Sequence, residues 1–166
     1  KDRLDARVEY VADKVGMTGE GGDLTEKLLR KILTAIDRAD EARVSRYLDL
    51  ARRTPKSCIV GLEGEVREHL SNRASMRNVL LPESLGFANM ELESTELVRY
   101  LITLDLVIHL VDLAIEDQLI EVKSIMIETP SRGRFKGGDS FISDYPVKLT
   151  IRGHSLPMLH YIQHLS

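Results

Sequence analysis

A long apolar helix that runs directly into a strand constrains this fold more than any other stretch. The helix pattern spans Ser94–Gln118, and the strand pattern follows over Leu119–Glu128. Apolar residues of the first half point to one side. In the second half, the polar face is rotated by about half a turn from the polar face of the first half. It consists of Asp105, His109, Asp112 and Glu116. Because its two ends need cover on different sides, we predict that this helix lies in the centre of the packing.

Charges inside this helix argue against a membrane span. Arg99, Asp105 and Asp112 would each cost roughly a few kcal/mol at bilayer depth, so we expect a buried helix of a soluble domain. The chain has 166 residues, of which 43% are hydrophobic, and fits one domain or one domain with a helical extension. A net charge of −3 and only 5% aromatic residues argue against nucleic-acid binding. The single Cys58 excludes an internal disulfide framework.

Residues 1–54 carry a helical pattern throughout most of their length. A short amphipathic stretch, Lys1–Val15, is followed by the glycine-rich segment Met17–Asp23, which ends it. No Gly or Pro interrupts Leu24–Arg53, which predicts one continuous helix. Apolar residues recur in it with the spacing of a coiled-coil seam: Leu28, Ile32, Ala35, Ala39 and Ala42. We predict a helical extension over 1–54, either a helical hairpin or a coiled coil, with the seam as an interaction surface.

Residues 55–166 mix helix and strand patterns, which indicates an α+β domain. Apolar spacing predicts a helix through about Arg73, and Asn78–Leu81 is typical of a short strand closed by proline. The polar, glycine-rich segment Thr129–Ser140 indicates a long loop. Another strand, Tyr145–Gly153, and a helix from Ser155 complete the order of elements.

The strand Tyr145–Gly153 has the clearest alternation in the chain. Val147, Leu149 and Ile151 share one face, which predicts one buried and one wet side. A connection without a helix favours antiparallel pairing with Leu119–Glu128. Two strands leave open edges that can accept a further strand. We therefore expect Val147, Leu149 and Ile151 to serve self-association through this half of the chain.

Three groups of residues allow a catalytic or nucleic-acid alternative. His160 and His164 are spaced to share a metal ion, with His154 just before them. Asp105, His109 and Asp112 suit acid/base chemistry on one helical face, although no pocket or nucleophile accompanies them. The segment Arg132–Lys136 resembles a basic, glycine-rich nucleic-acid contact. Histidines that face solvent, a partner-facing polar stripe and a mobile loop are the competing structural interpretations.

The second half resembles PilO-like pilus-assembly proteins and their GspM-like counterparts of type II secretion. The resembling residues run in order: AsnValLeuLeuProGluSerLeuGlyPhe (78–87), the long helix 94–118, LeuIleGluValLysSerIle (119–125), a variable loop, TyrProValLysLeuThrIleArgGly (145–153) and a helix from Ser155. The resemblance implies a ferredoxin-like fold of αββ units over 55–166. The second unit is truncated after its helix, and no membrane helix of the family's kind is present.

The resemblance also implies a function and a location. It implies a non-enzymatic scaffold without cofactors, on the periplasmic face of the inner membrane, held there only through an anchor outside this chain. Its partners would be a second copy, as a homodimer, and other proteins of the assembly machine, with no nucleic acid. Catalysis at His154, His160 and His164 and nucleic-acid binding at Arg132–Lys136 remain the alternatives.

Overall fold

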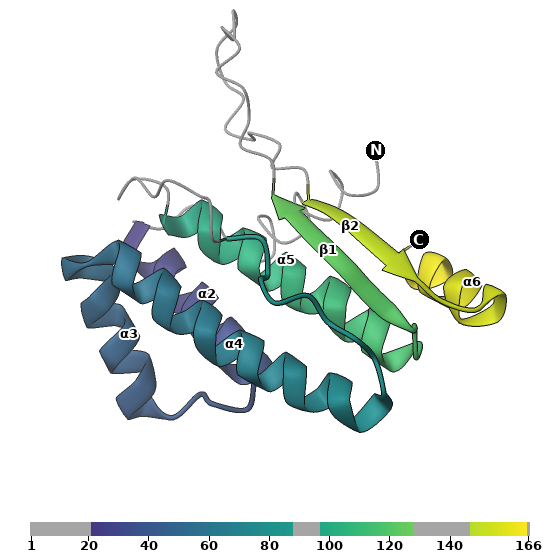
Figure 1. Cartoon of the computed structure of the whole chain (residues 1–166). Coiled ribbons are helices and arrows are strands. Elements are labelled where there is room, and N and C mark those ends of the chain that lie inside the picture. The colour runs from purple at the N-terminus through teal and green to yellow at the C-terminus, as the bar shows by residue number, and fades with distance from the viewer. Residues whose placement is uncertain (1–20, 88–96, 128–146, 166) are drawn as a thin grey trace, which may run out of the picture.

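Helices surround one central helix, and a small sheet lies over it (Figure 1). The structure is a computed structural model and describes residues 21–87, 97–127 and 147–165. The amphipathic stretch Lys1–Val15 and the segment Arg132–Lys136 lie outside these residues. In chain order, the described elements are α2 (Gly21–Ala35), α3 (Glu41–Arg53), α4 (Pro55–Arg77), α5 (Leu97–Glu116), β1 (Glu121–Ile127), β2 (Val147–Arg152) and α6 (Ser155–His164).

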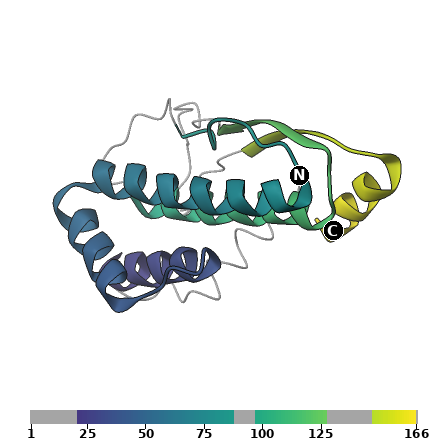
Figure 2. The same cartoon turned by 60° about the horizontal axis from the view of Figure 1, so that its bottom comes forward.

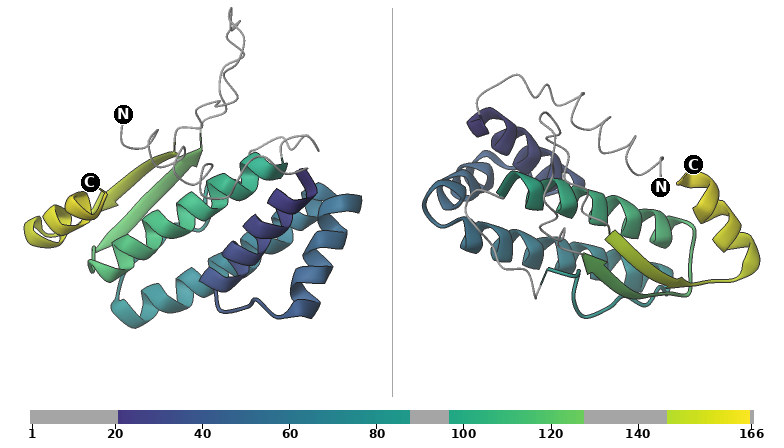
Figure 3. Two further views of the ribbon diagram at one scale, coloured as in Figure 1. Left: turned by 180° about the vertical axis from the view of Figure 1, so that it is seen from behind. Right: turned by 90° about the horizontal axis from the view of Figure 1, so that it is seen from above.

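Helix α5 is the central element, as the sequence predicts. It passes directly into β1, and buried side chains occur along its whole length, from Leu97 to Ile115. Helices α2 and α4 pack against it, and α4 lies along it in Figure 2. The sheet covers another side of α5, as the views in Figure 3 show. A helix covered by both helices and a sheet cannot keep one continuous wet face, which explains its divided polar pattern.

The continuous helix predicted over Leu24–Arg53 is wrong. Helix α2 ends at Ala35 and α3 begins at Glu41. Asp37 adopts a left-handed conformation with φ of 56°, and the Asp40 side chain accepts a hydrogen bond from the Arg43 backbone N–H at 2.9 Å. Aspartate tolerates the left-handed region and is a strong N-cap. Two aspartates therefore end one helix and start the next without any Gly or Pro.

One hydrophobic core joins the described elements on both sides of Pro55. Its buried side chains come from α2, α3, α4, α5, β1 and α6, and from segments between these elements. Helix α2 contributes Leu28, Leu29, Ile32 and Leu33, and α3 contributes Val44 and Tyr47. The described part of residues 1–54 is thus packed into the same core as the α+β half.

The sheet pairs β1 and β2 antiparallel, as predicted. Its register places apolar residues opposite each other on the inner face, which packs towards α5: Val122 with Ile151, Ile125 with Leu149, and Ile127 with Val147. A bulge lies between Val122 and Ser124. The predicted strand Asn78–Leu81 is reduced to a single parallel bridge between Leu80 and Glu121. Pro82 lacks an N–H donor and cannot extend that ladder.

Candidate functional site

The predicted coiled-coil seam does not form one exposed surface. Leu28 and Ile32 are buried in the core between α2 and its neighbours, whereas Ala35 and Ala39 are exposed at the end of α2 and in the following turn. The first two side chains therefore stabilise the fold of this chain. Because Ala39 also lies outside the helices and Ala42 belongs to α3, the seam positions do not share one continuous helix.

The polar face of α5 holds helices together. Asp105 accepts from the Lys31 ammonium of α2 at 2.5 Å, and Asp112 accepts from the Arg73 guanidinium of α4. Glu116 lies 3.5 Å from the other terminal nitrogen of Arg73. The two aspartates thus turn towards different helices. This arrangement supplies ion pairs that connect α5 to α2 and to α4.

Asp112 is a largely buried carboxyl group of this face. Its side chain is only 20% exposed. Burial raises the pKa of Asp112 above its usual range, whereas the positive charge of Arg73 acts in the opposite direction. The ionised form of Asp112 therefore depends on Arg73 for compensation.

Arg73→Met is expected to lower the free energy of unfolding by about 1–3 kcal/mol at neutral pH, because it leaves a largely buried carboxylate without its main partner. A carboxyl group whose pKa is raised in the folded state binds more protons there than in the unfolded state. Stability then rises as pH falls through that window. The deficit of the variant should therefore shrink on acidification in urea melts.

Arg53→Met is the matched control for this substitution. Arg53 pairs with Asp49 at 2.9 Å on the same helix, and both side chains are exposed. Such exposed pairs contribute about 0–0.5 kcal/mol. Equal losses for the two variants, or a deficit of Arg73→Met that does not depend on pH, would contradict the compensation of Asp112 by Arg73.

The three histidines of the metal alternative are not brought together. His164 Nδ1 lies 3.0 Å from Asp117 Oδ2, while His154 precedes α6 and His160 lies exposed on it. Within residues 21–87, 97–127 and 147–165, no cluster of three His, Cys, Asp or Glu side chains could hold a metal ion. The His164–Asp117 contact instead connects α6 to the segment after α5.

Cys58 is buried among the core side chains. Burial raises the pKa of its thiol to about 11, so the thiolate needed for nucleophilic attack is scarce at neutral pH. Its Sγ lies 3.6 Å from the Tyr47 carbonyl oxygen. Cys58 thus fills the core between α3 and α4.

Helix α6 carries the largest group of exposed apolar side chains in the described residues. Tyr161 anchors the helix: it is buried, and its hydroxyl donates to the Leu110 carbonyl of α5 at 3.3 Å. On the side away from Tyr161, three large side chains are each more than half exposed: Leu156, Leu159 and Ile162. We call these three residues the α6 stripe. Figure 1 shows α6 at the far end of the sheet, away from α3.

Strand β2 forms the second candidate surface. Val147, Leu149 and Ile151 are half-buried and pack against the core, while Lys148, Thr150 and Arg152 are exposed. The predicted alternation is therefore confirmed. The inner residues of β2 are less completely buried than Val122 and Ile125 of β1, as expected for a strand at the side of a sheet.

The sequence pattern of α6 predicts one apolar face made of Met158, Leu159, Ile162 and Leu165, and does not reveal the α6 stripe. In the structure, Met158 and Leu165 are partly buried, whereas Leu159 and Ile162 are exposed. The sequence signal for an uncovered apolar face is the presence of apolar residues on two faces of this ten-residue helix. Which face is covered depends on where Tyr161 enters the core, and the chain pattern alone does not decide this.

Comparisons with protein-family models, with curated proteins and with solved structures gave no match. Among the helices that the structure describes, none is both long and apolar enough to cross a membrane.

Proposed function

We propose that this chain is a non-enzymatic assembly protein, a scaffold of a pilus or type II secretion-like machine. It acts through helix and strand-edge contacts of its α+β half. The observation that carries the proposal is the α6 stripe, whose three large apolar side chains are each more than half exposed. Monomeric proteins rarely expose large contiguous apolar patches, and such patches are typical of protein–protein contacts.

The PilO-like resemblance supplies the rest of the proposal. In that family, the half corresponding to residues 55–166 is a ferredoxin-like domain of αββ units. The order α5–β1–β2 followed by α6 agrees with one such unit and the helix of the next. The location would be the periplasmic face of the inner membrane, and the partners a second copy and other proteins of the machine.

A homodimer through the α6 stripe is the testable part of this function. Sedimentation equilibrium at tens of micromolar is expected to give a dimer for the wild type. Leu159→Glu should shift the equilibrium towards monomer, because it puts a charge into an apolar contact. Val60→Glu is the matched control, since Val60 is 60% exposed on α4 and should leave the dimer intact. A strictly monomeric wild type would exclude a stable homodimer.

A further inference from the structure

Strand β2 has one edge that no described strand occupies. The sheet has the order β1–β2, and the bridge to Leu80 lies on the opposite side of β1. Ile120, which immediately precedes β1, marks the two sides: its N–H donates to the Arg152 carbonyl at 2.9 Å, and its carbonyl accepts from the Leu80 N–H at 3.0 Å. Since β1 lies between the two, further strands can join the sheet at the other edge of β2.

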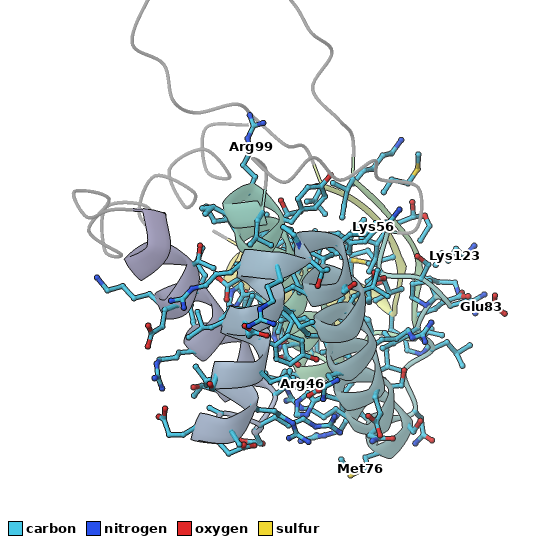
Figure 4. All side chains as sticks on the ribbon, turned by 90° about the vertical axis from the view of Figure 1, so that its left-hand side faces the viewer. Arg46, Lys56, Met76, Glu83, Arg99 and Lys123 are labelled. Atoms are coloured by element: carbon cyan, nitrogen blue, oxygen red, sulfur yellow. The ribbon has the colours of Figure 1, made fainter. Side chains whose placement is uncertain are left out.

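The outer face of β2 is positively charged on a chain whose net charge is −3. Lys148 lies opposite Met126 of β1, which cannot compensate its charge, and Lys148 forms no ion pair with a described residue. Arg152 lies opposite Glu121, with Nε and Oε2 at 3.2 Å. Lys123, on β1, adds a further exposed cation and projects outwards in Figure 4.

A second copy of β2 fits this edge poorly. Antiparallel pairing must keep apolar residues on the inner face, so the strand can shift only by two residues at a time. With the two-fold axis at Thr150, Lys148 of each copy lies opposite Arg152 of the other. With the axis at Leu149, the two Lys148 side chains become diagonal neighbours. Like charges opposite each other are destabilising, and diagonal neighbours remain within reach of long side chains.

We propose that this edge of β2, which no described strand occupies, binds an extended strand of another protein, with acidic residues on the outer face and apolar residues on the inner face. Backbone hydrogen bonds to β2 give such a strand its affinity. Its carboxylates lie beside Lys148 and Arg152, and its apolar residues extend the row of Val147, Leu149 and Ile151. The cations that oppose a second copy thus select an acidic partner. The inference rests on the scaffold role proposed above, but uses a different surface from the α6 stripe.

A blocked peptide of about eight alternating valine and glutamate residues is the probe, long enough for a typical strand. On titration into the full chain, the amide resonances of Val147–Arg152 are expected to shift, and binding should weaken as salt is added. Lys148→Glu is expected to weaken binding about threefold to tenfold, because it replaces a favourable cross-strand pair by a repulsive one. Lys123→Glu is the matched control: it changes the net charge equally but lies one strand from the edge, so its effect should be clearly smaller.

Three results would overturn the inference. The first is the absence of amide shifts in β2 at saturating peptide. The second is equal binding of a peptide of the same charge that carries a central proline, because proline interrupts the strand ladder and binding would then be charge attraction alone. The third is protection from hydrogen exchange, in a dimer only, of the β2 amides that point away from β1. That result would make this edge a self-interface. That third result would still support the homodimer, whereas a monomer that binds the peptide would contradict only the homodimer.

Discussion

Leu101→Ala is expected to lower the free energy of unfolding by about 2–5 kcal/mol, the range for truncating a fully buried leucine. Leu101 is 0% exposed in the first half of α5, where the helix is covered from several sides. The surrounding elements are held by other contacts and cannot collapse into the volume that the leucine side chain occupied, so a cavity should remain. Urea melts of the purified chain measure this loss directly.

Leu159→Ala is the matched control for this substitution. It removes the same atoms from a side chain that is 51% exposed on α6, and surface changes of this kind stay within about 0.5 kcal/mol. The melts should be made at protein concentrations below any dimerisation. If Leu101→Ala melts within that same margin of the wild type, α5 is not the central packing element.

Gly86→Ala is expected to destabilise the fold by about 2–4 kcal/mol, through backbone strain and a steric clash. Gly86 has φ of +91°, which L side chains rarely adopt. An added Cβ would lie 2.8 Å from the backbone carbonyl oxygen of Ile125 in β1. Because that oxygen belongs to a paired strand, the segment around Gly86 and strand β1 cannot move apart without disturbing the sheet. The midpoint of urea unfolding reports the loss.

Gly64→Ala provides the opposite control for the same chemical change. Gly64 lies within α4, and a Cβ there would have nothing within 4 Å. Alanine in place of a helical glycine should raise stability by about 0.5–1 kcal/mol. Opposite signs for the two glycine variants are therefore expected. A neutral Gly86→Ala would show that the segment before residue 87 is not held against β1.

The sequence predicted the candidate surfaces unevenly. The alternation of Val147, Leu149 and Ile151 was sufficient to predict β2, because a period of two residues has few other causes. The prediction of the coiled-coil seam depends on residue spacing alone. Spacing does not tell whether an apolar stripe packs against its own chain or against another protein. Leu28 and Ile32 show the difference, since both are used inside the core.

Short-range sequence patterns specify the local structure of this chain: the α5 helix that runs into β1, the wet and buried faces of β2, and the helix that follows. These depend on periodicity and on residues close together in the chain. Packing between distant elements decides which apolar faces are covered, that Lys31 and Arg73 pair with different aspartates of α5, and that α6 leaves a stripe exposed. The physical reason is that burial and ion pairing depend on distant elements meeting, and those meetings are set by how all the faces pack together.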